Sequence, residues 1–298
     1  ALDLLTTSRP GDPRPIHPDP LLVACRQRLR EGTEILYQQF DQGVPVTTLV
    51  RARSDLADEV LLKAWQAHFG EREDLSLVAV GGYGRRELQP ASDLDVLILV
   101  EPETETSLRE SLERFVTLLF DLGPQVGQSV RSIEECVSAA RRDVTVMTSL
   151  MESRLIAGGP QLLRRMREAL GPDHLWDSEQ FFNAKMGEQQ ARWHKFGDTA
   201  YNLEPNIKEN PGGLRDIQVI GWVAKRHFAA ETLHDLVDHG FLTEPEHEAL
   251  IEGQTHLWRI RFALHRLSGR HEDRLLFDYQ RTLARQFGFC DGEHNLAV

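Results

Sequence analysis

The sequence predicts an α+β protein whose first part mixes helices with strands and whose second part is almost entirely helical. Between residues 75 and 157, short apolar runs rich in β-branched residues alternate with segments of helical spacing. After about residue 160 we find no further strand pattern, and apolar residues recur at helical spacing. With 298 residues, 41% of them hydrophobic, the chain can form one large domain or two ordinary domains with packed cores.

The first part is predicted to begin with an arm and two helices. Five prolines within residues 1–20 fix φ and remove backbone donors, which predicts an extended arm. Helices are expected over 21–42 and 46–69, the second with a continuous apolar stripe that ends before Gly70. The remaining elements expected in this part are strands at 75–80, 94–100, 125–131 and 154–157 and helices at 105–122, from 132 onward and at 143–151.

The second part is predicted to contain helices joined by one long loop. The last of these helices opens with the capping-box spacing of Thr243 and Glu246. The same spacing, at Ser132 and Glu135, opens the helix expected from 132 in the first part. A loop rich in Asn, Pro and Gly covers 197–213. Helices are expected at 160–170, 178–196, 214–230, 231–239 and 243–268. We therefore divide the chain into an arm (1–20), a mixed domain (21–157) and a helical domain (158–298).

The charge and cysteine content exclude several classes of protein. The chain has 34 Lys and Arg against 46 Asp and Glu, a net charge of −12, whereas DNA, RNA and anionic membranes bind basic surfaces. The three cysteines form no CxxC pair, which argues against a disulfide framework or structural zinc. No apolar run reaches the roughly 18 residues of a membrane span, and the N-terminus lacks a signal-peptide pattern. We expect a cytoplasmic protein and, since it begins with Ala, a fragment of a longer chain.

Two carboxylates mark the segment that carries chemistry. A strand runs into Gly81 and Gly82, a polar turn follows, and a second strand begins at Asp93-Leu-Asp95. Because side chains alternate along a strand, Asp93 and Asp95 point to the same side and repel each other unless a cation lies between them. Magnesium accepts such hard oxygen ligands and keeps room for water and substrate phosphates. The sequence therefore predicts an Mg²⁺ site at Asp93 and Asp95.

The residues between the strands are suited to phosphate. Glycine at 81 and 82 lets backbone N–H groups approach phosphate oxygens, while Arg85 and Arg86 add cationic donors. Taken singly, a Gly-Gly pair is a turn and an Asp pair is a solvated strand edge. The combined order of strand, Gly-Gly, turn, Asp-x-Asp and strand instead favours attack on a metal-bound nucleoside triphosphate.

This segment resembles the nucleotidyltransferase superfamily typified by DNA polymerase β. That signature has a hydrophobic residue, Gly-Gly or Gly-Ser, and then a spaced Asp-x-Asp. The longer run GGYGRRELQPASDLD, at 81–95, is similar to the family of bifunctional uridylyltransferase/uridylyl-removing enzymes that modify the nitrogen-signalling protein PII. The blocks at 201–218 and 274–280 are also similar to that family, so the resemblance runs from about residue 21 to the end.

The resemblance implies a fold and a reaction. The fold would be a polymerase-β-like nucleotidyltransferase domain with a small mixed sheet, followed by an all-α domain. The reaction would be Mg²⁺-dependent transfer of UMP from UTP to a PII tyrosine, releasing pyrophosphate, with Asp93 and Asp95 holding the metal. The family's HD hydrolase and ACT sensor domains do not fit within this length. The residues assigned to the nucleotide are Gly81, Gly82, Arg85, Ser92, Lys208 and Arg215.

Two departures from the superfamily pattern leave alternatives open. The second motif position, often Ser, is Gly82, and the predicted strand at 125–131 has no carboxylate, so that Glu152 is the candidate for a third metal ligand. These departures would fit a catalytically silent nucleotide-binding regulatory domain. Because the residues that contact the base cannot be read from the sequence, an adenylyltransferase acting on another protein is a second alternative.

The helical part holds several further candidates. Lys208 and Arg215 could meet phosphate with Asp216 as a polar or metal partner, or the loop around them could only cap the helix expected at 214–230. His265 and His271 lack a metal-ligand spacing. Aromatic residues at helical spacing are expected to be core; these are Trp193, Trp222, Phe228, Trp258 and Phe262.

Overall fold

A four-stranded mixed sheet lies at the centre of the first part of the chain. The computed structural model describes residues 19–123 and 126–290. The strands follow the order β3-β2-β1-β4. β1 pairs antiparallel with β2 and β4, whereas β2 and β3 are parallel. Their bounds are β1 (Leu75–Ala79), β2 (Leu94–Val100), β3 (Val126–Arg131) and β4 (Arg154–Gly158).

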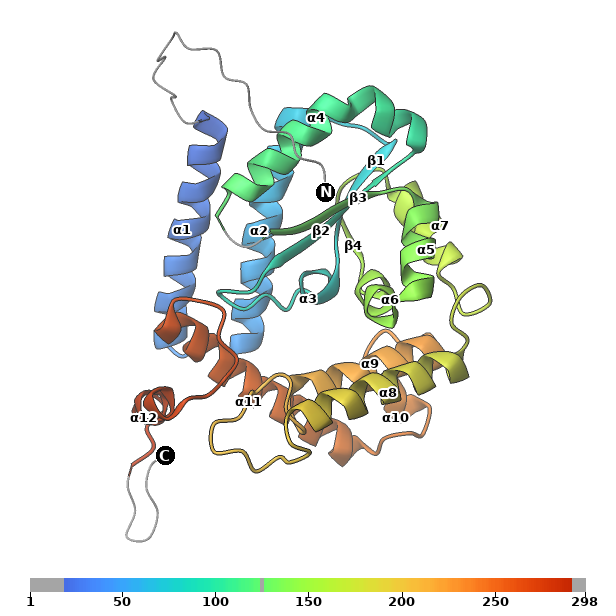
Figure 1. Ribbon diagram of the computed structural model, residues 1–298. Coiled ribbons are helices and arrows are strands. Elements are labelled where there is room, and N and C mark those ends of the chain that lie inside the picture. Colours follow the sequence, from blue (N-terminus) through green and yellow to red (C-terminus); the bar gives the residue numbers. More distant parts are fainter. Residues whose placement is uncertain (1–18, 124–125, 291–298) are drawn as a thin grey trace.

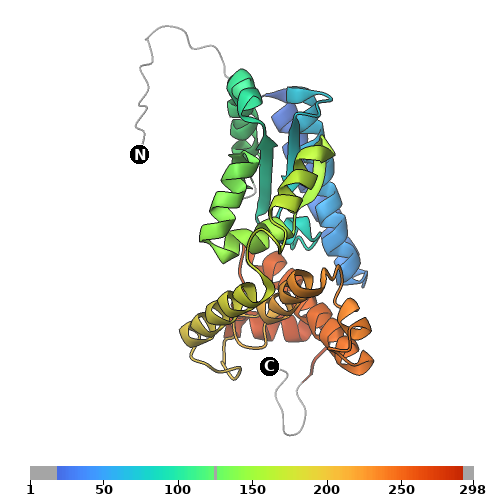
Figure 2. The same cartoon turned by 90° about the vertical axis from the view of Figure 1, so that its right-hand side faces the viewer.

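Helices cover both faces of this sheet (Figures 1 and 2). Leu77 and Ile98 belong to one core cluster, with α1 (Pro20–Asp41), α2 (Val46–Phe69) and α4 (Pro102–Asp121). Val78 and Leu99 belong to the cluster on the opposite face. The helices of that face are α5 (Ile133–Arg142), α6 (Val144–Met151) and α7 (Pro160–Ala169). Because both faces are buried, β1 and β2 are continuous apolar runs rather than alternating patterns.

The second part is helical and lies across one end of the sheet (Figure 1). Its helices are α8 (Ser178–Lys195), α9 (Leu214–Phe228), α10 (Asp235–Asp238), α11 (Glu244–Ser268) and α12 (Phe277–Gln286). α11 reaches back to the first part, where the ring of Phe262 packs at 4.7 Å from Phe40 and 6.2 Å from Tyr37. The predicted α+β class, with a small mixed sheet followed by helices, is confirmed.

Most predicted elements are present within three residues of their expected ends. Both capping boxes form: Ser132 with Glu135 begins α5, and Thr243 with Glu246 begins α11. The predicted arm falls largely on residues 1–18, outside the described residues, as does residue 125 of the third strand. The domain limits at 157 and 158 stay a prediction.

Two expectations about local structure are wrong, and one helix is missing from the prediction. The polar turn after β1 is a short helix, α3 (Gly81–Gly84). It forms although glycine disfavours helices because Tyr83 is buried and donates a hydrogen bond to Asp58 at 2.6 Å. The helix predicted at 231–239 is reduced to α10, since the preceding backbone N–H groups bond to the Asp235 carboxylate. The helix α12 was not predicted.

Gln89, in the loop before β2, provides a test of the packing. Its side chain is 1% exposed, and neither amide atom has a hydrogen-bond partner among the described residues. Burying an unpaired polar group costs roughly 1–3 kcal/mol. We therefore expect Gln89→Met to raise the free energy of unfolding by about 1 kcal/mol in urea titrations. Gln66→Met, at an exposed position of α2, is the matched control. A lower stability of Gln89→Met would show that the amide is satisfied in solution.

Candidate active site

A cavity of about 280 Å³ lies between the end of the sheet and the helical part. All eight residues assigned from sequence to metal or nucleotide line this cavity, namely Gly81, Gly82, Arg85, Ser92, Asp93, Asp95, Lys208 and Arg215. They come from segments on both sides of the predicted domain boundary. The sequence-based grouping therefore corresponds to one place in the fold, and the role of each residue stays a prediction.

The carboxylates of Asp93 and Asp95 provide the acidic side of the cavity. Asp93 directly precedes β2, and Asp95 is its second residue. Burial raises the pKa of Asp95, the charge of Asp93 raises it further, and the charge of Lys208 opposes both. Two ionised carboxylates so placed are unfavourable without a cation. Their hard oxygen atoms fit a divalent metal ion.

Glycines leave room around the Asp95 carboxylate. In the parallel pairing of β2 and β3, Asp95 lies beside Gly127, and a Cβ at Gly127 would lie 2.3 Å from Asp95 Oδ1. Gly81 has φ +57, and a Cβ there would lie 3.7 Å from Asp95 Oδ2. α3 is itself fixed by a close approach, because a Cβ at Gly84 would lie 1.6 Å from the carbonyl oxygen of Glu152. Small residues thus keep the surroundings of Asp95 open.

Cationic side chains line the same cavity as the carboxylates, namely Lys208, Arg215 and Arg261. Burial lowers the pKa of Lys208, and the neighbouring charges of Arg261 and Arg215 lower it further. Arg215 donates to Glu209 Oε1 at 3.0 Å and to Gln218 Oε1 at 2.9 Å. Such pre-positioned cations can stabilise the negative charge of a triphosphate.

The indole ring of Trp222 lies close to three cationic side chains. We expected it to be core, and it is 5% exposed, but its indole also lines the cavity. The ring centroid lies 4.5 Å from Lys185 Nζ, 5.4 Å from the guanidinium carbon of Arg215 and 5.9 Å from that of Arg85. Arg215, Gln218 and Trp222 share one face of α9 at helical spacing, which is the signal that could have found Trp222 from sequence.

Sequence reasoning missed other residues of the cavity wall. α6 contributes polar hydroxyls, and the region of α11 contributes aromatic and basic groups. The cavity residues that were not assigned to the site from sequence include Thr145, Thr148, Ser149, Glu188, Trp258, Arg261 and His271.

Three sequence candidates lie elsewhere. Glu152 does not line this cavity among the described residues; its carboxylate lies 3.6 Å from Lys225 Nζ in a neighbouring cavity of about 430 Å³. Arg86 lines that second cavity and pairs with Asp55 at 2.6 Å. Asp216 accepts hydrogen bonds from Arg192 and from the backbone N–H of Gly212, so it fixes the loop.

No helix among the described residues combines the length and apolar character that crossing a membrane requires.

Two family profiles match the chain. Residues 59–155 match the family described as nucleotidyltransferase domain. Residues 180–298 match the family described as GlnD PII-uridylyltransferase. The first match contains Gly81, Gly82, Asp93 and Asp95, and the second contains Lys208 and Arg215, so both matched regions contribute to the cavity.

Curated relatives are similar over most of this chain. A protein of Pseudomonas aeruginosa (strain UCBPP-PA14) named bifunctional uridylyltransferase/uridylyl-removing enzyme is 50% identical over 278 residues, 93% of this chain and 31% of the relative. A protein of the same name from Methylococcus capsulatus (strain Bath) is also 50% identical, over 93% of this chain and 32% of the relative. The chain therefore spans about a third of the length of these relatives.

Proposed function

The chain belongs to the PII-uridylyltransferase family and has that family's nucleotidyltransferase domain, and on this premise we propose that it transfers UMP from UTP to a PII signalling protein. The acceptor is a tyrosine hydroxyl, which loses its proton to solvent as its oxygen forms a bond to the α-phosphorus of UTP. The bond from that phosphorus to the β-phosphate oxygen breaks, and pyrophosphate leaves. The modified protein then reports nitrogen status.

The observation that carries this proposal is the composition of the cavity. The carboxylates Asp93 and Asp95 and the cations Arg85, Lys208 and Arg215 line the same 280 Å³ space. Nucleotidyl transfer depends mainly on positioning and on neutralising phosphate charge, and this arrangement supplies both. Asp93 and Asp95 would hold Mg²⁺, which neutralises charge on the phosphates when bound. Lys208 and Arg215 would bind the phosphate oxygens.

Transfer of label decides the function directly. The chain is incubated with a PII protein, Mg²⁺ and UTP labelled at the α-phosphate, in parallel with ATP labelled in the same way. We expect label from UTP on a PII tyrosine and none after the metal is removed with EDTA. Label from ATP instead would favour an adenylyltransferase. Nucleotide binding without transfer of either label would favour a silent regulatory domain.

A further inference from the structure

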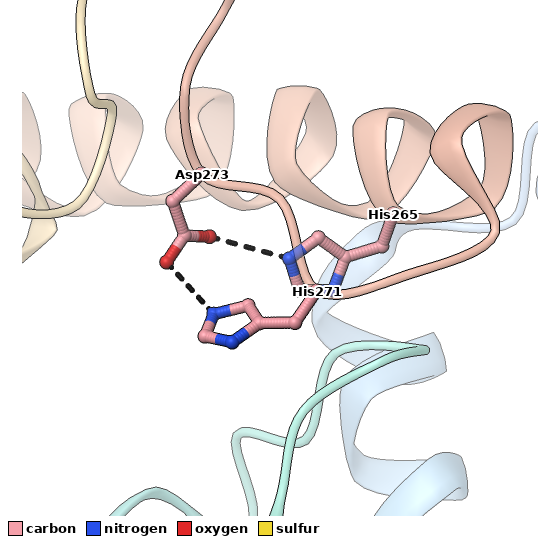
Figure 3. Close-up of side chains that lie close together, drawn as sticks. All are labelled: His265, His271 and Asp273. Carbon is pink, nitrogen blue, oxygen red and sulfur yellow. Dashed lines mark hydrogen bonds and ion pairs between the residues drawn. The ribbon is translucent and has the colours of Figure 1, made fainter.

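Asp273, in the segment between α11 and α12, is the buried centre of a polar cluster that includes the buried His265 and the exposed His271 (Figure 3). Its side chain is 8% exposed and bonds to groups on both sides. Oδ1 accepts from Arg261 Nε at 2.6 Å and lies 3.2 Å from His265 Nε2, while Oδ2 lies 3.0 Å from His271 Nε2. Burial raises the pKa of Asp273, but the hydrogen bonds from the two histidines and the charge of Arg261 outweigh it and hold the pKa far below its ordinary value.

The spacing of His265, His271 and Asp273 would suit a metal ion, but their hydrogen bonds do not. The backbone N–H of Ala91 donates to His265 Nδ1 at 3.3 Å, so Nδ1 is the acceptor and Nε2 carries the proton. A protonated Nε2 donates to Asp273 and cannot bind a metal. Burial lowers the pKa of His265, which favours this neutral ring. Arg261 already supplies the positive charge beside Asp273.

The backbone around Asp273 holds the loop that carries Lys208. The carbonyl oxygen of Asp273 accepts from the N–H of Ile207 at 2.9 Å. Arg274 forms an isolated β-bridge with Asn206, and the N–H of Leu275 donates to the carbonyl oxygen of Pro205 at 2.8 Å. Lys208 directly follows this paired segment and is therefore fixed by it.

The side chain of Asp273 is connected to a second loop of the cavity, the one that carries Ser92 and Asp93. Through His265 it holds Ala91, which is one residue before Ser92 and two before Asp93. The carbonyl and the carboxylate of one residue thus connect two cavity loops that are far apart in the sequence.

We propose that Asp273 is a positioning residue for nucleotidyl transfer. It holds the loop that carries Lys208 at a fixed distance from the loop that carries Ser92 and Asp93. This inference rests on the proposed function for its kinetic effect. The geometry it describes does not depend on the reaction. A misplacement of about 1 Å between reacting groups can cost about a hundredfold in rate.

The kinetic test replaces Asp273 with Asn. The amide keeps the size of the side chain, but it loses the charge and places an N–H₂ group among donors. We expect kcat to fall by about a hundredfold, with KM for UTP changed at most a few-fold, because the groups remain present but misplaced. Asp273→Glu restores the charge and should recover part of the rate. Asp278→Asn, at an exposed position of α12, should behave as the unchanged chain does.

A second readout is independent of activity. Amide hydrogen exchange should accelerate together in the peptides that cover 86–93 and 203–209 in Asp273→Asn, and in neither peptide in Asp278→Asn. If Asp273→Asn does not fold, His265→Gln interrupts the connection to Ala91 at one point and must still lower kcat and loosen 86–93. Unchanged kcat and exchange in a folded Asp273→Asn, or in His265→Gln, would overturn the proposal. If the unchanged chain transfers no UMP but Asp273→Asn still accelerates exchange in both peptides, the geometry is supported and only the function is rejected.

Discussion

Replacing Asp95 with Asn should reduce nucleotidyl transfer by about a thousandfold or more, because a metal ion supplies several kcal/mol of charge stabilisation and each 1.36 kcal/mol is about tenfold in rate. Asp93→Asn should have a similar effect. Both amides match the carboxylates in shape, so the fold should remain. The rate is measured in a single turnover with α-labelled UTP and a PII protein.

The same Asp95→Asn substitution should preserve or raise the stability of the metal-free protein. Burial and the charge of Asp93 raise the pKa of Asp95, which means that the ionised carboxylate is disfavoured in the folded state. Above that raised pKa the ionised group weakens folding, and the amide removes this penalty. Thermal unfolding in EDTA measures the difference, with Asp173→Asn at an exposed position as the control. Turnover near the original rate in both active-site variants would exclude the proposed metal site.

Gly127→Ala should reduce transfer by about a hundredfold without unfolding the protein. The added Cβ would lie 2.3 Å from Asp95 Oδ1, whereas the nearest backbone atom, Asp95 Cα, would lie 3.9 Å away. The clash is therefore relieved by rotating the carboxylate of Asp95 rather than by moving β3. A rotated carboxylate no longer faces the position shared with Asp93.

The dependence of the rate on Mg²⁺ concentration tests whether the loss of rate comes from a rotated Asp95 carboxylate. The Mg²⁺ concentration that gives half-maximal rate should rise in Gly127→Ala, while the unfolding temperature changes little. Gly253→Ala, on α11, is the matched control, because its added Cβ meets no atom within 4 Å. A Gly127→Ala variant with the original rate and Mg²⁺ dependence would mean that the position of the Asp95 carboxylate is not critical.

Most helices and strands of the fold could be predicted, because the residues that start, stop and bury them lie close together in the sequence. Both capping boxes lie within four consecutive residues, and the apolar runs of β1 and β2 follow from burial on both faces. α3 was not predictable in this way. Its glycines favour a turn, and only the contact of Tyr83 with Asp58, 25 residues earlier, shows why the chain coils there.

The site was predictable where the sequence has a motif and unpredictable where it depends on tertiary contact. Asp93 and Asp95 share a side because of strand geometry, and the structure places them in one cavity with Lys208. The spacing from Arg215 places Trp222 on the same face of α9, but that spacing is also typical of a core residue. The other two cationic neighbours of Trp222, Lys185 and Arg85, come from separate segments that only the fold brings together. Glu152 could be matched with its partner only in three dimensions, because Lys225 lies on α9.

The hydrogen bond between Ala91 and His265 has a consequence for dividing this protein into modules. The bond crosses the boundary that we predict at residue 157, as does the cavity itself. An excised sheet region would retain both carboxylates and Arg85 yet lack Lys208 and Arg215, and an excised helical region would retain Lys208 and Arg215 without Asp93 and Asp95. Transplanting either half into another protein would therefore transfer a fold without its chemistry, so that the smallest exchangeable unit includes the segment through Asp273.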